Sequence, residues 1–390
     1  MTQTLRLAYV PLVDAAPLIV AHEIGFAAEE GLTLDLQRTQ SWAQVRDLLG
    51  VGAVDAAHML APMPVAQAMG LGPQYPPFDV LMLLSQGGQA IAVSQPVAAQ
   101  MQLAGHVFDF HDPVTAGAAL LAATGGTLRI AVPFPFSTHT LIVRHWLAAC
   151  GFGTGVSVHT VPPPLMANAL AAGEVDAVCV GEPWSSVAAD AGVGVLLLSG
   201  MAIWAAAPEK ALVMRRDRAM ADGPLTGALM RALWRAARWL DVTENRGTAA
   251  EILARDRYLD LSPTLTEHAL LGRFAVGPAG HIRTGPDFMR FHRGAASFPW
   301  KSVAALFADR IARLHGLDPA MAVTAAMACF RTDLYRQHLR SAGADLPGAS
   351  AKVEGAMAHP TAVASEQGQM ILPADAFFDG WQFDPLFAAR

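Results

Sequence analysis

Gly52-Ala53-Val54-Asp55-Ala56 returns later in the chain as Gly173-Glu174-Val175-Asp176-Ala177, one of three blocks that occur twice in the same order. The other two pairs are residues 4–8 with residues 127–131, and residues 18–22 with residues 141–145. In each copy an apolar strand is followed by a proline-containing loop, a helix, a second strand, another helix and a third strand. A repeat of this length exceeds the roughly 20–50 residues of a solenoid unit. We therefore predict two α/β lobes of related design, with a ligand site in the cleft between them.

The composition is that of a globular protein without a general affinity for polyanions. Of the 390 residues, 53% are hydrophobic and 15% are charged, which argues against extended disorder. The net charge of −6 disfavours direct binding to nucleic acid or to an anionic membrane. Cys150, Cys179 and Cys329 lie far apart and in no C-x-x-C pattern, so neither a disulfide framework nor a zinc site is expected. Any anion must therefore be captured by local geometry.

The order of strand-like and helix-like segments divides the chain into four parts. Residues 1–94 form the first part of lobe I and residues 95–204 form lobe II, both built on doubly wound mixed sheets. Residues 205–285 return to lobe I and are largely helical. Residues 286–390 form a C-terminal helical extension whose tail packs on the body. In the second half of the chain, long amphipathic helices are expected over residues 225–240, 249–258, 265–274, 303–314 and 321–339.

The sequence lacks signals for export and for catalysis. Met1 is followed directly by the first strand, with neither an export leader nor an early lipid-attachment cysteine, so we expect a cytoplasmic protein. There is no P-loop, no dinucleotide-binding glycine pattern, no H-E-x-x-H and no G-x-S-x-G. The matched Asp55 and Asp176 are expected to bridge a strand–helix junction instead of acting as an acid–base pair. We predict a protein that is not an enzyme and that has no cofactor or metal.

Polar residues in loops next to strand ends are the best candidates for a ligand site. In doubly wound sheets, ligands bind outside the carboxyl ends of the strands. His139 opens a helix after a strand, where free N–H groups and the helix dipole favour an anion. Gly181 follows another strand, and without a Cβ atom it lets a ligand approach the backbone closely. Gln89 at a turn, Trp42 ahead of a helix and Lys210 after a charge-poor segment complete the set.

Longer motifs around these residues resemble one family of binding proteins. The motifs are Trp42-Ala43-Gln44-Val45-Arg46-Asp47, Asp55-Ala56-Ala57-His58-Met59-Leu60-Ala61-Pro62-Met63-Pro64, Gly181-Glu182-Pro183-Trp184 and Pro208-Glu209-Lys210. They make the chain similar, almost end to end, to the nitrate/nitrite/bicarbonate-binding proteins of the NrtA/CmpA type. The resemblance implies the two-lobed periplasmic-binding-protein type 2 fold with a helical C-terminal extension. It also implies that nitrate or nitrite is held in the cleft by Trp42, Gln89, His139, Gly181 and Lys210.

Within this family, the missing leader makes the chain most similar to the cytoplasmic NasS-type nitrate/nitrite sensors. The resemblance implies that such a sensor holds a NasT-type RNA-binding antiterminator inactive and releases it when the anion binds. One alternative is a substrate-binding subunit of an ABC transporter, and another is a pyrimidine-precursor synthase of thiamine biosynthesis. A positive charge at Lys210 would repel the calcium ion associated with bicarbonate-binding members, which favours nitrate or nitrite as the ligand. Neither Lys210 nor His139 is expected to lie in the apolar core.

Overall fold

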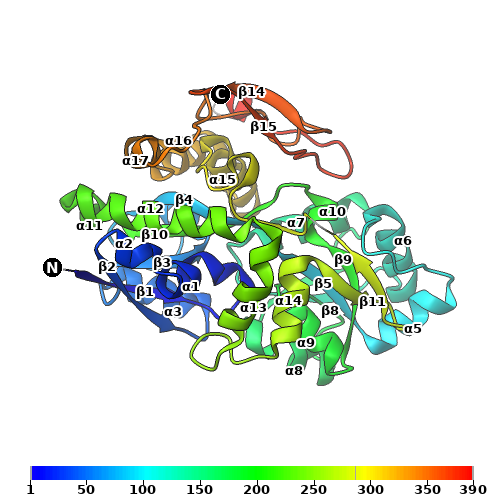
Figure 1. The fold of residues 1–390 in the computed structure, drawn as a ribbon. Helices are drawn as coiled ribbons and strands as arrows, with labels where there is room; N and C mark the ends of the chain where they lie inside the picture. The colour runs from blue at the N-terminus through cyan, green and yellow to red at the C-terminus, as the bar shows by residue number, and fades with distance from the viewer. Residues whose placement is uncertain (1, 286, 389–390) are drawn as a thin grey trace.

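Two β-sheets, each covered by helices, form two lobes, and an extension formed by the last part of the chain lies across them (Figure 1). The computed structural model describes residues 2–285 and 287–388. We call the six-stranded sheet with its helices lobe I and the five-stranded sheet with its helices lobe II. This architecture confirms the predicted two-lobed α/β fold with mixed sheets.

Lobe I is built on a mixed sheet with the strand order β13-β4-β10-β3-β1-β2. Its strands are β1 (Gln3–Tyr9), β2 (Leu32–Arg38), β3 (Ala56–Leu60), β4 (Phe78–Gly87), β10 (Pro208–Arg215) and β13 (Met289–Arg290). The helices between its first four strands are η1 (Val13–Ala15), α1 (Ala16–Glu23), α2 (Phe26–Glu29), α3 (Trp42–Gly50) and α4 (Pro62–Ala68). β1 pairs in parallel with β2 and β3, whereas β10 runs antiparallel to β3 and β4. The strands β3 and β4 are buried along their whole length, in keeping with their apolar sequences.

Lobe II repeats this design on a sheet with the order β7-β6-β8-β5-β9. Its strands are β5 (Gln89–Ser94), β6 (Leu128–Val132), β7 (Val156–Thr160), β8 (Ala177–Gly181) and β9 (Gly194–Ser199). Its helices are α5 (Gln95–Leu103), α6 (Pro113–Thr124), α7 (Thr138–Ala149), η2 (Pro163–Leu165), α8 (Met166–Ala171), α9 (Trp184–Asp190) and α10 (Gly200–Ile203). The parallel strands β7-β6-β8 correspond to β2-β1-β3 of lobe I.

The matched aspartates of the sequence repeat make the same contact in both lobes. The Arg6 N–H donates to Asp55 Oδ2 at 2.9 Å, and the Arg129 N–H donates to Asp176 Oδ2 at 2.9 Å. Each aspartate N–H returns a bond to the carbonyl of the same arginine at 2.8 Å. Both aspartates therefore tie the first strand of the repeat to the segment that enters the third strand, which is a structural bridge.

The chain passes from lobe I to lobe II at Gly87 and Gly88. Both glycines have a left-handed backbone, with φ of 70° and 87°, which favours residues without a Cβ atom. β5 already belongs to the sheet of lobe II, so this crossing precedes residue 94, where the sequence suggested the end of the first segment. The chain returns to lobe I between α10 and β10.

Helices dominate the chain after β10. They are α11 (Arg216–Ala221), α12 (Gly223–Leu240), η3 (Thr243–Asn245), α13 (Arg246–Ala254), α14 (Pro263–Leu271), η4 (Arg293–Ala295), α15 (Lys301–His315), α16 (Pro319–Cys329), α17 (Thr332–Leu339), η5 (Arg340–Ala342) and α18 (Pro385–Ala388). The single helix predicted over residues 321–339 is wrong, because α16 and α17 are separate. Phe330 forms a bridge with Val80 of β4, and the Arg331 N–H donates to the Val80 carbonyl at 2.9 Å. Pairing with the sheet thus takes these two residues out of helical geometry.

Two β-hairpins interrupt the helical second half and were not predicted. They are β11 (Arg273–Val276) with β12 (His281–Thr284), and β14 (Thr361–Ser365) with β15 (Gly368–Leu372). The tail that follows β15 lies against lobe II, where Phe377 stacks on Trp204 with ring centroids 4.7 Å apart. In the described part of the chain, no helix combines the length and apolar character needed to span a membrane.

Candidate ligand-binding site between the lobes

Two of the predicted site residues stand at helix starts that a serine caps. Trp42 is the first residue of α3, and the Ser41 side chain accepts the Gln44 N–H. His139 is in the first turn of α7, and the Ser137 side chain accepts the Thr140 N–H. Because such caps fix where a helix begins, they also fix the direction of the side chains in its first turn.

The other predicted residues come from strands that meet at the junction of the lobes. Gln89 begins β5, Gly181 ends β8, and the two are direct partners across these neighbouring strands. Lys210 lies in β10 opposite Leu60 of β3. A Cβ atom on Gly181 would stand 2.6 Å from Leu12 Cδ2 of lobe I, so the closed lobes leave no room for a side chain here unless Leu12 shifts.

A chain of ionic contacts connects the two lobes at this junction. Lys210 Nζ lies 2.7 Å from Asp14 Oδ2 and 2.8 Å from Glu209 Oε1. Glu209 Oε1 also lies 3.2 Å from His139 Nδ1 of lobe II, and Asp14 Oδ1 lies 3.2 Å from His58 Nε2. All five side chains are at most 1% exposed, so their interactions are weakly screened by water. We call these five residues the ionic cluster.

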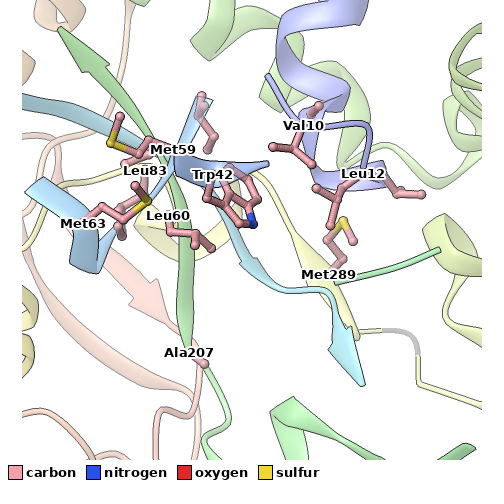
Figure 2. Packing of buried hydrophobic residues seen from close by; sticks show 14 of the residues in the cluster. Val10, Leu12, Trp42, Met59, Leu60, Met63, Leu83, Ala207 and Met289 are labelled. Carbon is pink, nitrogen blue, oxygen red and sulfur yellow. The ribbon is translucent and has the colours of Figure 1, made fainter. Parts of the chain in front are cut away.

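The remaining predicted residues lie beside the ionic cluster. The Trp42 ring centroid is 5.3 Å from Lys210 Nζ, and the position that a Cβ of Gly181 would occupy is 3.6 Å from Asp14 Oδ2. Figure 2 shows the indole of Trp42 in the buried apolar cluster. Since Gln89 pairs with Gly181, the structure brings Trp42, Gln89, His139, Gly181 and Lys210 together.

Several buried polar atoms at this place have no hydrogen-bond partner among the described residues. They are Trp42 Nε1, both amide atoms of Gln89, His58 Nδ1, His139 Nε2, Ser85 Oγ and Glu209 Oε2. Buried polar groups in folded proteins are nearly always hydrogen-bonded, because an unpaired one costs about 1–3 kcal/mol. A concentration of such atoms in one place indicates a binding site for a polar ligand.

The pKa values of the ionic cluster follow from burial and from the contacts described above. Burial alone would raise the pKa of Asp14, but Lys210 and His58 outweigh it and bring the pKa down to about 2. Burial would lower the pKa of Lys210, yet the two carboxylates raise it above its ordinary value. Burial lowers the pKa of His58, and burial together with Lys210 lowers that of His139, so both rings are neutral.

Glu209 differs from the other members of the cluster because its pKa falls near neutrality. Burial raises this pKa to about 7, although Lys210 opposes the increase. At pH 7 the cluster thus holds one ammonium group, the Asp14 carboxylate and a partly ionised Glu209. Its charge is between neutral and −1, with no excess positive charge.

The sequence prediction was wrong about the surroundings of two residues and missed others. Lys210 and His139 were expected outside the core, but both are 0% exposed. Asp14, His58 and Glu209 were not proposed as site residues. A signal existed for Asp14, which is the only charged residue between Arg6 and Glu23. Glu209 likewise directly follows a long uncharged segment and precedes Lys210.

Three hydrogen bonds hold the lobes against each other around the cluster. The Val13 N–H donates to the Glu182 carbonyl at 2.9 Å, and Trp184 Nε1 donates to the Pro11 carbonyl at 2.8 Å. Thr138 Oγ1 of lobe II donates to the Pro208 carbonyl at 2.6 Å. Together with the burial of the ionic cluster, these bonds show that the lobes are closed over the site.

Donors from both lobes thus converge on a closed, water-poor site that suits a small polar ligand. Within residues 2–285 and 287–388, no three His, Cys, Asp or Glu side chains are placed to hold a metal ion together. Gln89 and a neutral histidine can donate or accept, whereas Trp42 and Lys210 only donate. The donor-rich composition favours an acceptor such as an oxyanion.

Comparison with known proteins agrees with this geometry. A profile of the NMT1-like family matches residues 1–254. The chain is 32% identical over 394 residues to the nitrate/nitrite binding protein NrtA of Synechococcus elongatus, covering 97% of this chain and 83% of the relative. It is 31% identical over 321 residues to the bicarbonate-binding protein CmpA of a Synechococcus species, covering 78% and 70%.

The same similarity is present in three dimensions. The crystal structure of the periplasmic nitrate-binding protein NrtA from Synechocystis PCC 6803 superposes with a TM-score of 0.86 at 26% identity. The superposition covers 99% of this chain and 97% of that protein, so it includes the C-terminal extension. The chain therefore belongs to the NMT1-like family, within its NrtA/CmpA group of binding proteins with the periplasmic-binding-protein fold.

Proposed function

We propose that the closed site binds nitrate or nitrite without catalysing a reaction. The observation that supports this most directly is the set of buried, unpaired donors at Trp42, Gln89 and His139 beside the Lys210 ammonium. Nitrate is planar, monovalent and a weak acceptor, so several convergent donors must replace its water. Lys210 supplies charge and the other three supply directed hydrogen bonds. The similarity to nitrate-binding proteins supports this class of ligand.

Charge balance sets a condition on this binding. With Glu209 ionised, Asp14 and Glu209 already compensate Lys210, and an added anion would be buried without a counter-charge. With Glu209 protonated, the cluster is neutral before the anion arrives. The neutral carboxyl group also offers an O–H donor at Oε2, which has no partner among the described residues. We therefore propose that the protein takes up one proton on Glu209 together with each anion.

Bicarbonate is a competing ligand that the site chemistry does not exclude. Lys210 is not the isolated positive charge expected from the sequence, because Asp14 and Glu209 lie next to it. Bicarbonate also brings an O–H donor, which an ionised Glu209 could accept. The longer match to a nitrate/nitrite binding protein, 97% of the chain against 78% for the bicarbonate-binding relative, favours nitrate or nitrite.

We propose that the bound anion is delivered to the permease of an ABC transporter. Hinged closure of two lobes over a ligand is how such binding proteins capture it. The near-complete superposition on a periplasmic nitrate-binding protein supports this role over the sensor role. In this reading the partner is a permease that contacts both lobes in their closed arrangement.

The sensor role remains a second proposal that uses the same closure with a different partner. A cytoplasmic protein of this type would bind a NasT-type antiterminator in its ligand-free form, and the anion would weaken that complex. Localising the native protein separates the two roles, since a transporter subunit must be exported. Co-purification with an antiterminator only in the absence of nitrate would instead favour the sensor role.

Calorimetric titration of the purified chain with nitrate, nitrite and bicarbonate tests the ligand. We expect nitrate or nitrite to bind in the micromolar range, roughly −8 kcal/mol. Trp42→Phe keeps an aromatic ring but removes the indole N–H, so affinity should fall about tenfold. Trp239→Phe on α12 is the matched control. The proposal fails if neither nitrate nor nitrite binds at millimolar concentration.

A further inference from the structure

A second cavity lies outside the ionic cluster, between lobe II and the C-terminal extension. Its volume is about 520 Å³, and its walls come from α7, α15 and the tail after β15. The polar side chains in its lining are Arg144, His145, Arg310, Arg313, Asp379 and Trp381. It shares no lining residue with the site between the lobes.

The lining of this cavity carries more positive than negative charge. Among the residues that the structure describes, neither Arg144 nor Arg310 forms a salt bridge, whereas Arg313 pairs with Asp309 on its own helix. The one lining carboxylate, Asp379, is occupied by His145 Nε2 at 3.0 Å. Arg144 and Arg310 therefore have no carboxylate within salt-bridge distance among the described residues, although Asp309 and Asp379 act on the charge of Arg310 from farther away.

Arg310 is also held in position. Its guanidinium carbon lies 3.9 Å from the ring centroid of Trp381, and its Nη2 lies 3.5 Å from His145 Nδ1. Burial lowers the pKa of Arg310, although Asp309 opposes the decrease, because the guanidinium is partly removed from water. A guanidinium fixed by an aromatic ring loses little conformational entropy when it binds an anion.

We propose that this cavity is a second anion site, which takes a small multivalent oxyanion such as a phosphate-bearing or polycarboxylate metabolite. The guanidinium groups of Arg144 and Arg310 match the paired oxygens of phosphate and carboxylate groups. A monovalent anion would compensate only part of the excess charge, and the volume is within the range of metabolite-sized pockets. Because the walls belong to lobe II and to the extension, a ligand here would bridge the two.

The test is calorimetric titration of the full chain with pyrophosphate and with citrate at low ionic strength. The wild-type protein should bind at least one of them, and 0.5 M NaCl should weaken this binding because it depends on charge. Arg144→Gln changes an exposed side chain and should weaken binding at least fivefold without altering the fold. The double variant Arg144→Gln/Arg310→Gln should abolish it. Arg283→Gln, outside the cavity, should bind like the wild type.

Two further results decide whether the anion occupies this cavity or the site between the lobes. Lys210→Met should weaken nitrate binding roughly ten- to a hundredfold and keep pyrophosphate or citrate binding. The arginine variants should show the opposite pattern. Failure of the wild type to bind either probe at 5 mM would overturn the proposal, as would equal binding by the wild type and the double variant. Neither result depends on whether the first site takes nitrate.

Discussion

Replacing Glu209 by Gln should remove the pH dependence of nitrate binding. Glu209 Oε1 contacts Lys210 and His139, and burial raises the pKa of Glu209 to about 7. Asp14, with a pKa near 2, stays ionised between pH 6 and 8, and Lys210, with a raised pKa, stays protonated. Burial lowers the pKa of His58 and, together with Lys210, lowers that of His139 well below its ordinary value, which favours neutral rings. Glu209 is therefore the carboxyl group of the ionic cluster that titrates there.

The magnitude follows from linkage between the proton and the anion. If nitrate binds only the form with neutral Glu209, the apparent Kd scales with 1 + 10^(pH − 7), so it rises about tenfold from pH 6 to pH 8. The wild type should therefore lose affinity as the pH rises, because a raised carboxyl pKa means that ionisation occurs within this window. The always-neutral amide of Glu209→Gln should bind nitrate with nearly the same Kd at both values.

Calorimetry at several pH values and in two buffers with different ionisation enthalpies measures both quantities. Near pH 8 the wild type should take up about one proton per nitrate, and Glu209→Gln should take up none. Glu182, also buried with a pKa raised to about 7, provides the matched control. Glu182→Gln should keep the tenfold pH dependence, whatever its absolute affinity. A wild-type Kd that stays constant from pH 6 to 8 would refute the charge-balance argument.

Three other substitutions test different parts of the structure. Lys210→Met should weaken nitrate binding roughly ten- to a hundredfold. It should also lower the free energy of unfolding by about 3–5 kcal/mol, because it leaves buried carboxylates without their cation, and an unchanged stability to denaturant would contradict this. Gly181→Ala should hold the lobes apart, since the new Cβ would stand 2.6 Å from Leu12 Cδ2. Nitrate affinity should therefore fall more than tenfold while the stability of the ligand-free protein stays near that of the wild type, and X-ray scattering in the presence of nitrate should show the open conformation. As the pH rises from 6 to 8, the wild type should lose roughly 1 kcal/mol of stability relative to Glu182→Gln, because the buried wild-type carboxyl must ionise as the pH passes its raised pKa. The same difference in melting temperature between the two proteins at both pH values would disprove this.

Local sequence patterns predicted most of the first two hundred residues and failed where distant segments pair. The repeated blocks indicated the two lobes, and the paired contacts of Asp55 and Asp176 show why those blocks recur. The break between α16 and α17 was missed because its cause is Val80, far away in the chain. Helical periodicity continues through Phe330, so only pairing with the edge of the sheet could interrupt it.

The sequence alone determined the alternation of strands and helices and the loop positions from which a ligand would be held. These features depend on periodicity, on helix caps and on motifs, all of which are local. Only the tertiary structure decided the charge of the site. It places Lys210 Nζ within 2.8 Å of carboxylate oxygens of Asp14 and Glu209 and removes all three side chains from water. Burial and pairing set the protonation of these groups, and both depend on segments far apart in the chain that meet only in the folded protein.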